Sequence, residues 1–403
     1  MRPRGHCEAA KPTKQSGGRF ASLAMTLVFA AAVALADDSP FELGGHTKFR
    51  ILGQSYPDDS LFRDLVGSSS LDAAGELRLN FSTKRQQWSF FADYQLLGLH
   101  SELLPLVASH REILPVGLPN DDRRLFDFTK ILSDSNENAV VHRLDRFWVG
   151  YTGEKAVVRF GRQALSWGNG LFFSPMDLIN PFDPTTIDTE YKTGDDMLYL
   201  QYLRDSGDDW QAAVVFRRDL LSGDVDSDQS TVALKYHGFA GEQEYDVLVA
   251  DSYGDTVIGV GGVRSIGGAI WRGDVVVTDS STDTVVEVVT NLSYSWVWNG
   301  KNVSTGIEYY HDGVDSNYVA ASLMIELSPL WMMTPTLISN VDDQSALLQL
   351  VNQYSLSDNM TFLGSLNVPL GANGTEFGGP GSGVPDRYLS FDLAVFAQLA
   401  WYF

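Results

Sequence analysis

Charged, amide and aromatic side chains that could act on a polar solute gather in residues 159–183, which read RFGRQALSWGNGLFFSPMDLINPFD. A strand-like alternation at the start of this stretch breaks at glycines and prolines, so neither a strand nor a helix continues through it. A loop of this length that carries so many aromatic residues is expected to pack against a surface or inside a cavity. Opposed charges in such a loop would select solutes by charge and orient them. The candidate residues are Arg159, Arg162, Gln163, Trp167, Phe173, Asp177 and Asp183.

Bond-making chemistry is not indicated by the sequence. There is no G-x-S-x-G or H-E-x-x-H motif, and the seven histidines are scattered along the chain, so we expect no enzyme activity and no cofactor. Asp224, Asp226 and Asp228 form a D-x-D-x-D run that resembles part of a Ca²⁺ loop. The glycine and the distal glutamate of an EF-hand are missing from this run. A solvated acidic loop is therefore favoured over a Ca²⁺ site.

The first 36 residues are expected to be a cleaved signal peptide, because basic residues precede an apolar run that closes on Ala34-Leu35-Ala36. Cleavage would leave 24 Lys+Arg (29 − 5) and 50 Asp+Glu (51 − 1), a net charge near −26 that argues against nucleic acid as a partner. It would also remove Cys7, the one cysteine. Since the remainder has no apolar run long enough for a spanning helix, a membrane location would require a β-barrel.

The end of the chain favours the barrel. In FDLAVFAQLAWYF, residues 391–403, every odd-numbered position is apolar, which is the pattern of a strand with one face toward lipid. A final strand that closes on an aromatic residue, here Trp401 and Phe403, resembles the terminal signal that the assembly machinery of bacterial outer-membrane barrels recognises.

Similar runs elsewhere predict a single antiparallel up-and-down transmembrane barrel over residues 37–403, with about 18 strands and 16 as the alternative. With the N-terminus in the periplasm, the long connections (about 53–73, 98–139, 164–195, 219–228 and 370–386) all fall on the extracellular side, and short turns fall on the periplasmic side. Within the second long connection, residues 101–110 and 121–131 each predict a short helical turn. A barrel of this size leaves a lumen, which Lys48, Arg50, Arg78 and Arg146 are predicted to face.

The pattern GRQ-x-x-x-WG-x-G-x-x-F-x-P-x-D-x-x-NPF, matched from Gly161 to Phe182, resembles a motif of a group of outer-membrane porin-like proteins. The resemblance implies a bacterial outer-membrane channel for small hydrophilic solutes or ions, narrowed by residues 164–195. The alternative is a non-conducting or plugged barrel that acts as an adhesin, a structural anchor or part of an export or electron-transfer complex. Expected partners are outer-membrane lipid and lipopolysaccharide, the barrel-assembly machinery and small solutes, with a homo-oligomer as a further possibility.

Overall fold

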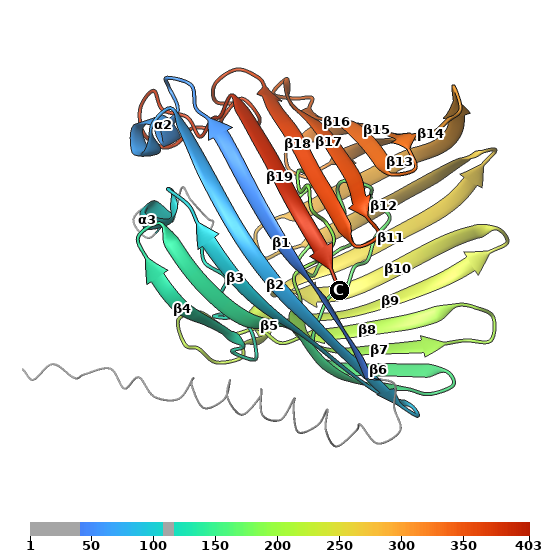
Figure 1. The fold of residues 1–403 in the computed structure, drawn as a ribbon. Coiled ribbons are helices and arrows are strands. Elements are labelled where there is room, and N and C mark those ends of the chain that lie inside the picture. Colours follow the sequence, from blue (N-terminus) through green and yellow to red (C-terminus); the bar gives the residue numbers. More distant parts are fainter. Residues whose placement is uncertain (1–40, 108–116) are drawn as a thin grey trace, which may run out of the picture.

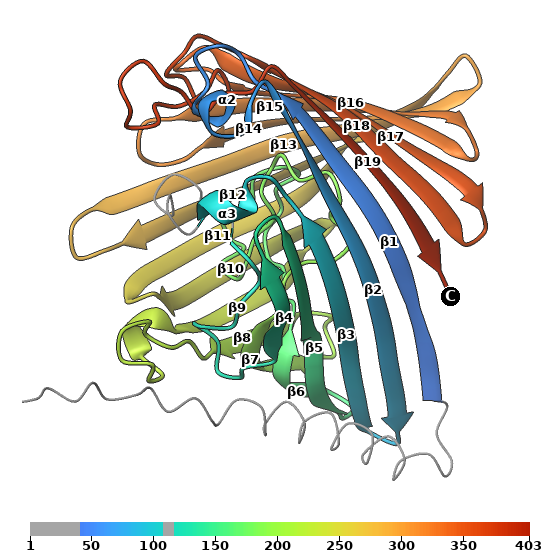
Figure 2. The same ribbon diagram turned by 60° about the vertical axis from the view of Figure 1, so that its left-hand side comes forward.

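The computed structural model describes residues 41–107 and 117–403, which form one closed antiparallel barrel (Figures 1 and 2). The predicted signal peptide lies outside the described residues. The strands are β1 (Phe41–Ser55), β2 (Ser69–Arg85), β3 (Trp88–His100), β4 (Thr129–Ser135), β5 (Asn138–Thr152), β6 (Ala156–Gln163), β7 (Asp195–Leu203), β8 (Asp209–Val215), β9 (Thr231–Ala240), β10 (Gln243–Ser252), β11 (Asp255–Ile266), β12 (Ala269–Asp279), β13 (Thr284–Trp298), β14 (Lys301–His311), β15 (Asn317–Ser328), β16 (Trp331–Asn340), β17 (Ser345–Ser357), β18 (Met360–Leu370) and β19 (Leu393–Tyr402).

Eighteen of these strands form the ring, because β4 pairs with β5 and β3 passes directly to β5. The ring closes where β1 pairs with both β2 and β19. The prediction of 18 strands is confirmed, and the alternative of 16 is excluded. Two short helices, α2 (Leu61–Val66) and α3 (Leu104–Val107), and the 3-10 turn η1 (Ser227–Gln229) lie in connections.

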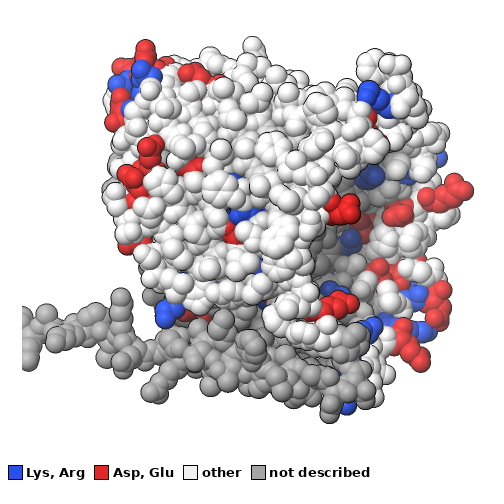
Figure 3. Space-filling view, viewed as in Figure 1, with Lys and Arg blue, Asp and Glu red and all other residues white. Residues whose placement is uncertain are grey.

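The wall is apolar outside and polar inside, the reverse of a soluble protein. On β1, Phe49 is 57% exposed while its neighbour Lys48 is 3% exposed, and on β14 Ile307 is 53% exposed while Glu308 is 1% exposed. Figure 3 shows the result on one face, a largely uncharged surface with Lys, Arg, Asp and Glu gathered toward its margins. This alternation is the pattern of a transmembrane barrel.

The two ends of the barrel differ, as the sequence predicts. At one end, called the turn end here, connections of two to five residues join the strands, as at 86–87 and 204–208. The other end, the loop end, carries the long connections 56–68, 101–128, 164–194, 216–230 and 371–392. Within the described residues, no helix is both long and apolar enough to cross a bilayer.

Two predicted local structures differ from those observed. Residues 121–131 do not form a helical turn, because they contain a turn, an extended segment and the start of β4. Part of 101–110 does form a short helix, α3, whereas residues 108–110 are outside the described part of the chain.

Candidate functional site

The connection between β6 and β7, residues 164–194, lies inside the barrel and is called the inner loop. Its first part follows the inner wall from β8 to β14. The indole Nε1 of Trp167 donates to Gln211 Oε1 of β8 at 2.7 Å, and the amide of Asn169 donates to Asp274 of β12 at 2.6 Å. Asn291 of β13 donates to the backbone oxygen of Asn169 at 3.0 Å. These contacts hold the loop against the side of the ring formed by β8 to β14.

Glu308 of β14 anchors the turn of the inner loop. Its carboxylate accepts three successive backbone N–H groups, from Leu171 at 2.5 Å, Phe172 at 3.0 Å and Phe173 at 2.8 Å, and the Asn291 amide at 3.1 Å. Gly306 lies beside this turn, where a Cβ would be 2.8 Å from Leu171 Cδ1 and the Leu171 side chain would have to shift. The loop is therefore fixed to the wall by its backbone.

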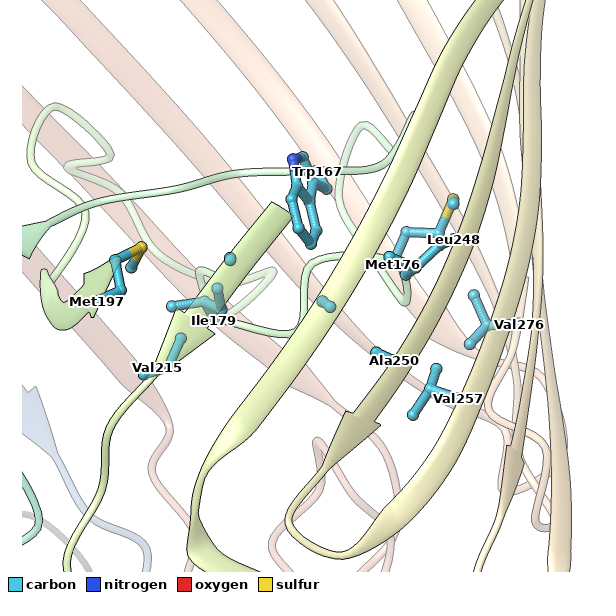
Figure 4. Packing of buried hydrophobic residues seen from close by; sticks show 11 residues of the cluster. Trp167, Met176, Ile179, Met197, Val215, Leu248, Ala250, Val257 and Val276 are labelled. Carbon is cyan, nitrogen blue, oxygen red and sulfur yellow. The ribbon is translucent and has the colours of Figure 1, made fainter. Parts of the chain in front are cut away.

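Apolar packing supports the same segment. Trp167, Met176 and Ile179 are buried against inward residues of strands β7 to β12, as Figure 4 shows. Phe173 stacks on Tyr310 with ring centroids 4.5 Å apart and also contacts Tyr318. The barrel thus contains a small hydrophobic core of its own, made by this loop and one side of the wall.

The last part of the inner loop crosses to the opposite side of the ring. Gln349 of β17 donates to the backbone oxygen of Thr185, and Gln398 of β19 donates to Asp188, both at 2.9 Å. Lys48 Nζ of β1 lies 2.6 Å from Asp188 and 2.7 Å from Glu190. Burial acts to raise the pKa of Asp188, but hydrogen bonds from Lys48 and Gln398 outweigh it and hold this pKa below its ordinary value.

A salt bridge ties the two parts of the loop together. Lys192 Nζ lies 2.6 Å from Asp177 and also donates to the backbone oxygen of Leu165 at 2.6 Å. Burial raises the pKa of Asp177 and lowers that of Lys192, and the contact between the two side chains opposes both shifts. The guanidinium of Arg146 donates to the backbone oxygen of Lys192, which joins this bridge to β5.

Arg162, which the sequence analysis lists among the residues that narrow the pore, lies instead in the barrel wall, where β6, β7 and the connection 101–128 meet. Its guanidinium donates to Asp196 of β7 at 2.9 Å, to Asp121 at 2.9 Å and to the backbone oxygen of Phe126 at 2.6 Å. It shares a strand face with Phe160, an outward residue that is 40% exposed. The reason is that β6 ends at Gln163, where the chain turns inward, and the acids that neutralise Arg162 come from the neighbouring strand and from the connection 101–128.

The connection 101–128 leads into β4, which extends the wall beside the short strand β6. Register partners show β6 beside residues 147–152 of β5, whereas β4 pairs with residues 138–143 of the same strand. β4 therefore takes the place in the ladder that β6 leaves empty.

The other predicted residues have different surroundings. Asp183 is exposed and accepts bonds from the backbone and hydroxyl of Thr185 in a local turn. Gln163 is buried and donates to the backbone oxygen of Met197 at 3.4 Å. Arg159 lies over the ring of Trp148, 5.0 Å from its centroid, and is exposed. Of the residues predicted to face the lumen, Arg78 lies over the ring of Tyr191 in the inner loop, 4.2 Å from its centroid.

A polar cavity of about 120 Å³ remains between the inner loop and strands β1, β2, β3 and β5. Four cations face three carboxylates there, and its lining consists of Lys48, Arg50, Glu76, Arg78, Gln95, Arg143, Asp145, Asp188, Tyr191 and Thr193. This is a narrow, strongly charged space in which a small polar solute would meet both signs of charge.

Sequence reasoning missed the wall residues that hold the loop: Gln211, Asp274, Asn291, Glu308, Tyr310, Gln349 and Gln398. All are on wall strands, and the alternation of Glu308 with Ile307 could have marked it as inward. Nothing local to these strands indicates which of them meets the loop.

The acidic run Asp224, Asp226 and Asp228 lies in the connection 216–230. Asp226 caps η1 by accepting from the backbone N–H of Asp228 at 2.7 Å. In residues 41–107 and 117–403, no group of three or more His, Cys, Asp or Glu side chains is arranged to hold a metal ion.

The terminal residues of the chain complete the seam between β19 and β1. The backbone of Phe403 exchanges hydrogen bonds with Gly45, donating at 3.0 Å and accepting at 2.9 Å. The side chains of Trp401 and Phe403 are exposed and contact each other, with ring centroids 5.2 Å apart.

Comparison with solved structures supports the fold. OccAB4 of Acinetobacter baumannii aligns with a TM-score of 0.53 and 8% identity over 90% of this chain and 98% of that one. Wzi of Escherichia coli, described as an outer-membrane carbohydrate-binding β-barrel involved in group 1 capsule assembly, aligns with a TM-score of 0.52 and 11% identity over 97% of this chain and 89% of that one. No family model matches the sequence. No curated protein matches it either. At these identities the likeness shows an outer-membrane barrel fold and no more.

Proposed function

We propose that this protein is a bacterial outer-membrane channel for small hydrophilic solutes or ions, with the inner loop as its constriction. The observation that carries the proposal is the position of residues 164–194 across the lumen, bonded to opposite sides of the ring through Glu308 and Lys48. A loop held so firmly narrows a pore to a fixed size. The charged cavity beside it would sort solutes by charge.

Other properties follow from the same proposal. The barrel resides in the outer membrane with its loop end outward, and the exposed pair Trp401 and Phe403 carries the signal read during assembly. The protein has no catalytic role.

A single experiment tests the channel. The purified protein in a planar lipid bilayer should give discrete conductance steps, and deleting residues 167–188 should increase the step size. Deleting 220–223 is the control, because Leu221 at this loop tip is 98% exposed and shortening the tip should leave the step size unchanged. Silence of both the native and the 167–188 deletion proteins would refute the proposal.

A plugged, non-conducting barrel is the second candidate. It is favoured by the reach of the inner loop, which contacts strands from β8 to β14 and again β17, β19, β1 and β2. In that case the native protein would be silent and the 167–188 deletion would conduct.

A further inference from the structure

A second cavity lies at the loop end and differs in character from the charged one. It measures about 640 Å³ and lies between strands β1, β2, β3 and β19 and the connections that carry α2 and α3. Its walls are largely apolar side chains, among them Leu52, Phe62, Ala74, Leu99, Leu104 and Phe396. Pockets of about 300–1,000 Å³ with apolar walls and a few polar groups are typical of small-molecule sites.

Arg50 joins the two cavities, since it lines both. Its guanidinium is 3.9 Å from Glu76, whose carboxylate also lies 3.3 Å from His46 and 3.3 Å from Arg78. The Arg50 side chain is 34% exposed, whereas Lys48 and Arg78 beside it are 3% exposed and closely paired. Arg50 is therefore the cation of this group that a molecule in the apolar cavity can reach.

We propose that the apolar cavity binds solutes that carry an apolar body and a single carboxylate, with the body against Leu52, Leu99 and Phe396 and the carboxylate on Arg50. The proposal rests on the channel function and narrows its substrates to this class. Asp72 also lines the cavity, and its partner in the ladder is Leu52, which lies two residues closer to the loop end than Arg50. Its charge would disfavour a second anionic group on the solute.

Binding can be measured without any current, by calorimetry of the purified barrel in lipid nanodiscs. The probes are 4-phenylbutyrate and the uncharged 4-phenylbutan-1-ol. The carboxylate should bind more tightly than the alcohol. Arg50→Gln should weaken binding of the carboxylate by about tenfold, the value of one charge-assisted hydrogen bond, and leave the alcohol unchanged.

A matched pair of variants locates the site. Leu99→Trp places a bulky ring in the cavity where the apolar body of the probe would lie, and should weaken both probes by tenfold or more. Leu71→Trp makes the same change on the outer face of β2, where Leu71 is 55% exposed, and should weaken neither. Migration of the unheated protein as a folded barrel in gel electrophoresis confirms that each variant is intact.

Several results would overturn the proposal. Equal affinity for the acid and the alcohol, or no effect of Arg50→Gln, would refute the assignment of Arg50 as the carboxylate-binding group. Tighter binding of 4-phenylbutylamine than of the acid assigns the charge recognition to Asp72 instead. If the protein conducts but binds neither probe, the binding site is refuted and the channel proposal stands. If it binds 4-phenylbutyrate without conducting, the channel proposal is refuted and the binding site stands.

Discussion

Glu308 offers the sharpest test of how the inner loop is held. In Glu308→Gln the side chain keeps its volume, but one carboxylate oxygen becomes an NH₂ group that cannot accept a hydrogen bond. If the replaced oxygen is Oε1, the N–H groups of Phe172 and Phe173 lose their acceptor; if it is Oε2, Leu171 and Asn291 lose theirs. Each orientation therefore breaks two of the four bonds.

The cost follows from these two bonds. Hydrogen bonds to a charged group contribute about 1.5–3 kcal/mol each, which gives about 3–6 kcal/mol for two. Part is offset because a neutral amide is cheaper to bury than a carboxylate, so we expect a net loss of about 2–3 kcal/mol. Since about 1.4 kcal/mol is a factor of ten, the undocked population of the loop should rise by about 30-fold to 150-fold.

Single-channel recording reads this population directly. Glu308→Gln should show frequent excursions to a higher conductance that the native protein rarely visits. Glu326→Gln is the matched control, because Glu326 lies on the adjacent strand β15 and accepts from Asn302 of the wall. If Glu308→Gln recorded the same step size and dwell times as the native channel, the anchoring role of this carboxylate would be refuted.

Three further variants probe the wall and the second side of the loop. Arg162→Gln should destabilise the barrel by about 3 kcal/mol, seen as a lower temperature for loss of the compact gel band, because it removes the cation that pairs with the buried Asp196 and leaves Asp121 with Arg124 alone; the exposed Arg159→Gln on the same strand should cost about 1 kcal/mol or less. Gly161→Ala should impair folding, because Gly161 has φ +125° and a Cβ there would lie 2.2 Å from the backbone oxygen of Phe147; normal refolding yield would contradict this. The lowered pKa of Asp188 means that its contribution to docking is complete above the ordinary Asp pKa of about 4 and is lost as the pH falls through the lowered value, so current noise should rise below about pH 4 and stay constant from pH 7 to 5. Asp188→Asn should show the acid behaviour at pH 7, and equal noise at both pH values in the native channel would count against the assignment.

The ring itself was predictable because its signal is local. Period-two alternation, such as Phe49 beside Lys48, places each strand without knowledge of its neighbours. The parity of long and short connections then excludes a slip of the assignment by one strand, although it left 16 strands open beside 18. The prediction was less accurate at strand ends: the connection predicted over about 370–386 extends to residue 392, because Arg387 and Tyr388 bond to the connection 56–68 instead of continuing β19.

The contacts around Arg162 could not be predicted, because they depend on residues that are distant in sequence. β4 forms a strand because β6 leaves an edge of β5 without a partner, and this depends on where the chain between β6 and β7 goes. Phe126 and Asp121 reach Arg162 from 36 and 41 positions away in sequence. The pattern around residues 121–131 contains none of this information, so it was interpreted as a helical turn.

The two sides of the inner loop are held by different kinds of interaction, and this difference indicates which side would move first. Toward β8 to β14 the loop packs in an apolar cluster and bonds through its backbone to a buried carboxylate, contacts that salt hardly affects. Toward β19 and β1 it depends on Lys48 with Asp188 and Glu190, of which Glu190 is 36% exposed. Exposed ion pairs weaken with salt and with acid. Any widening of the lumen should therefore begin at the β1 side, where the charged cavity and Arg50 lie, while the Glu308 side stays fixed.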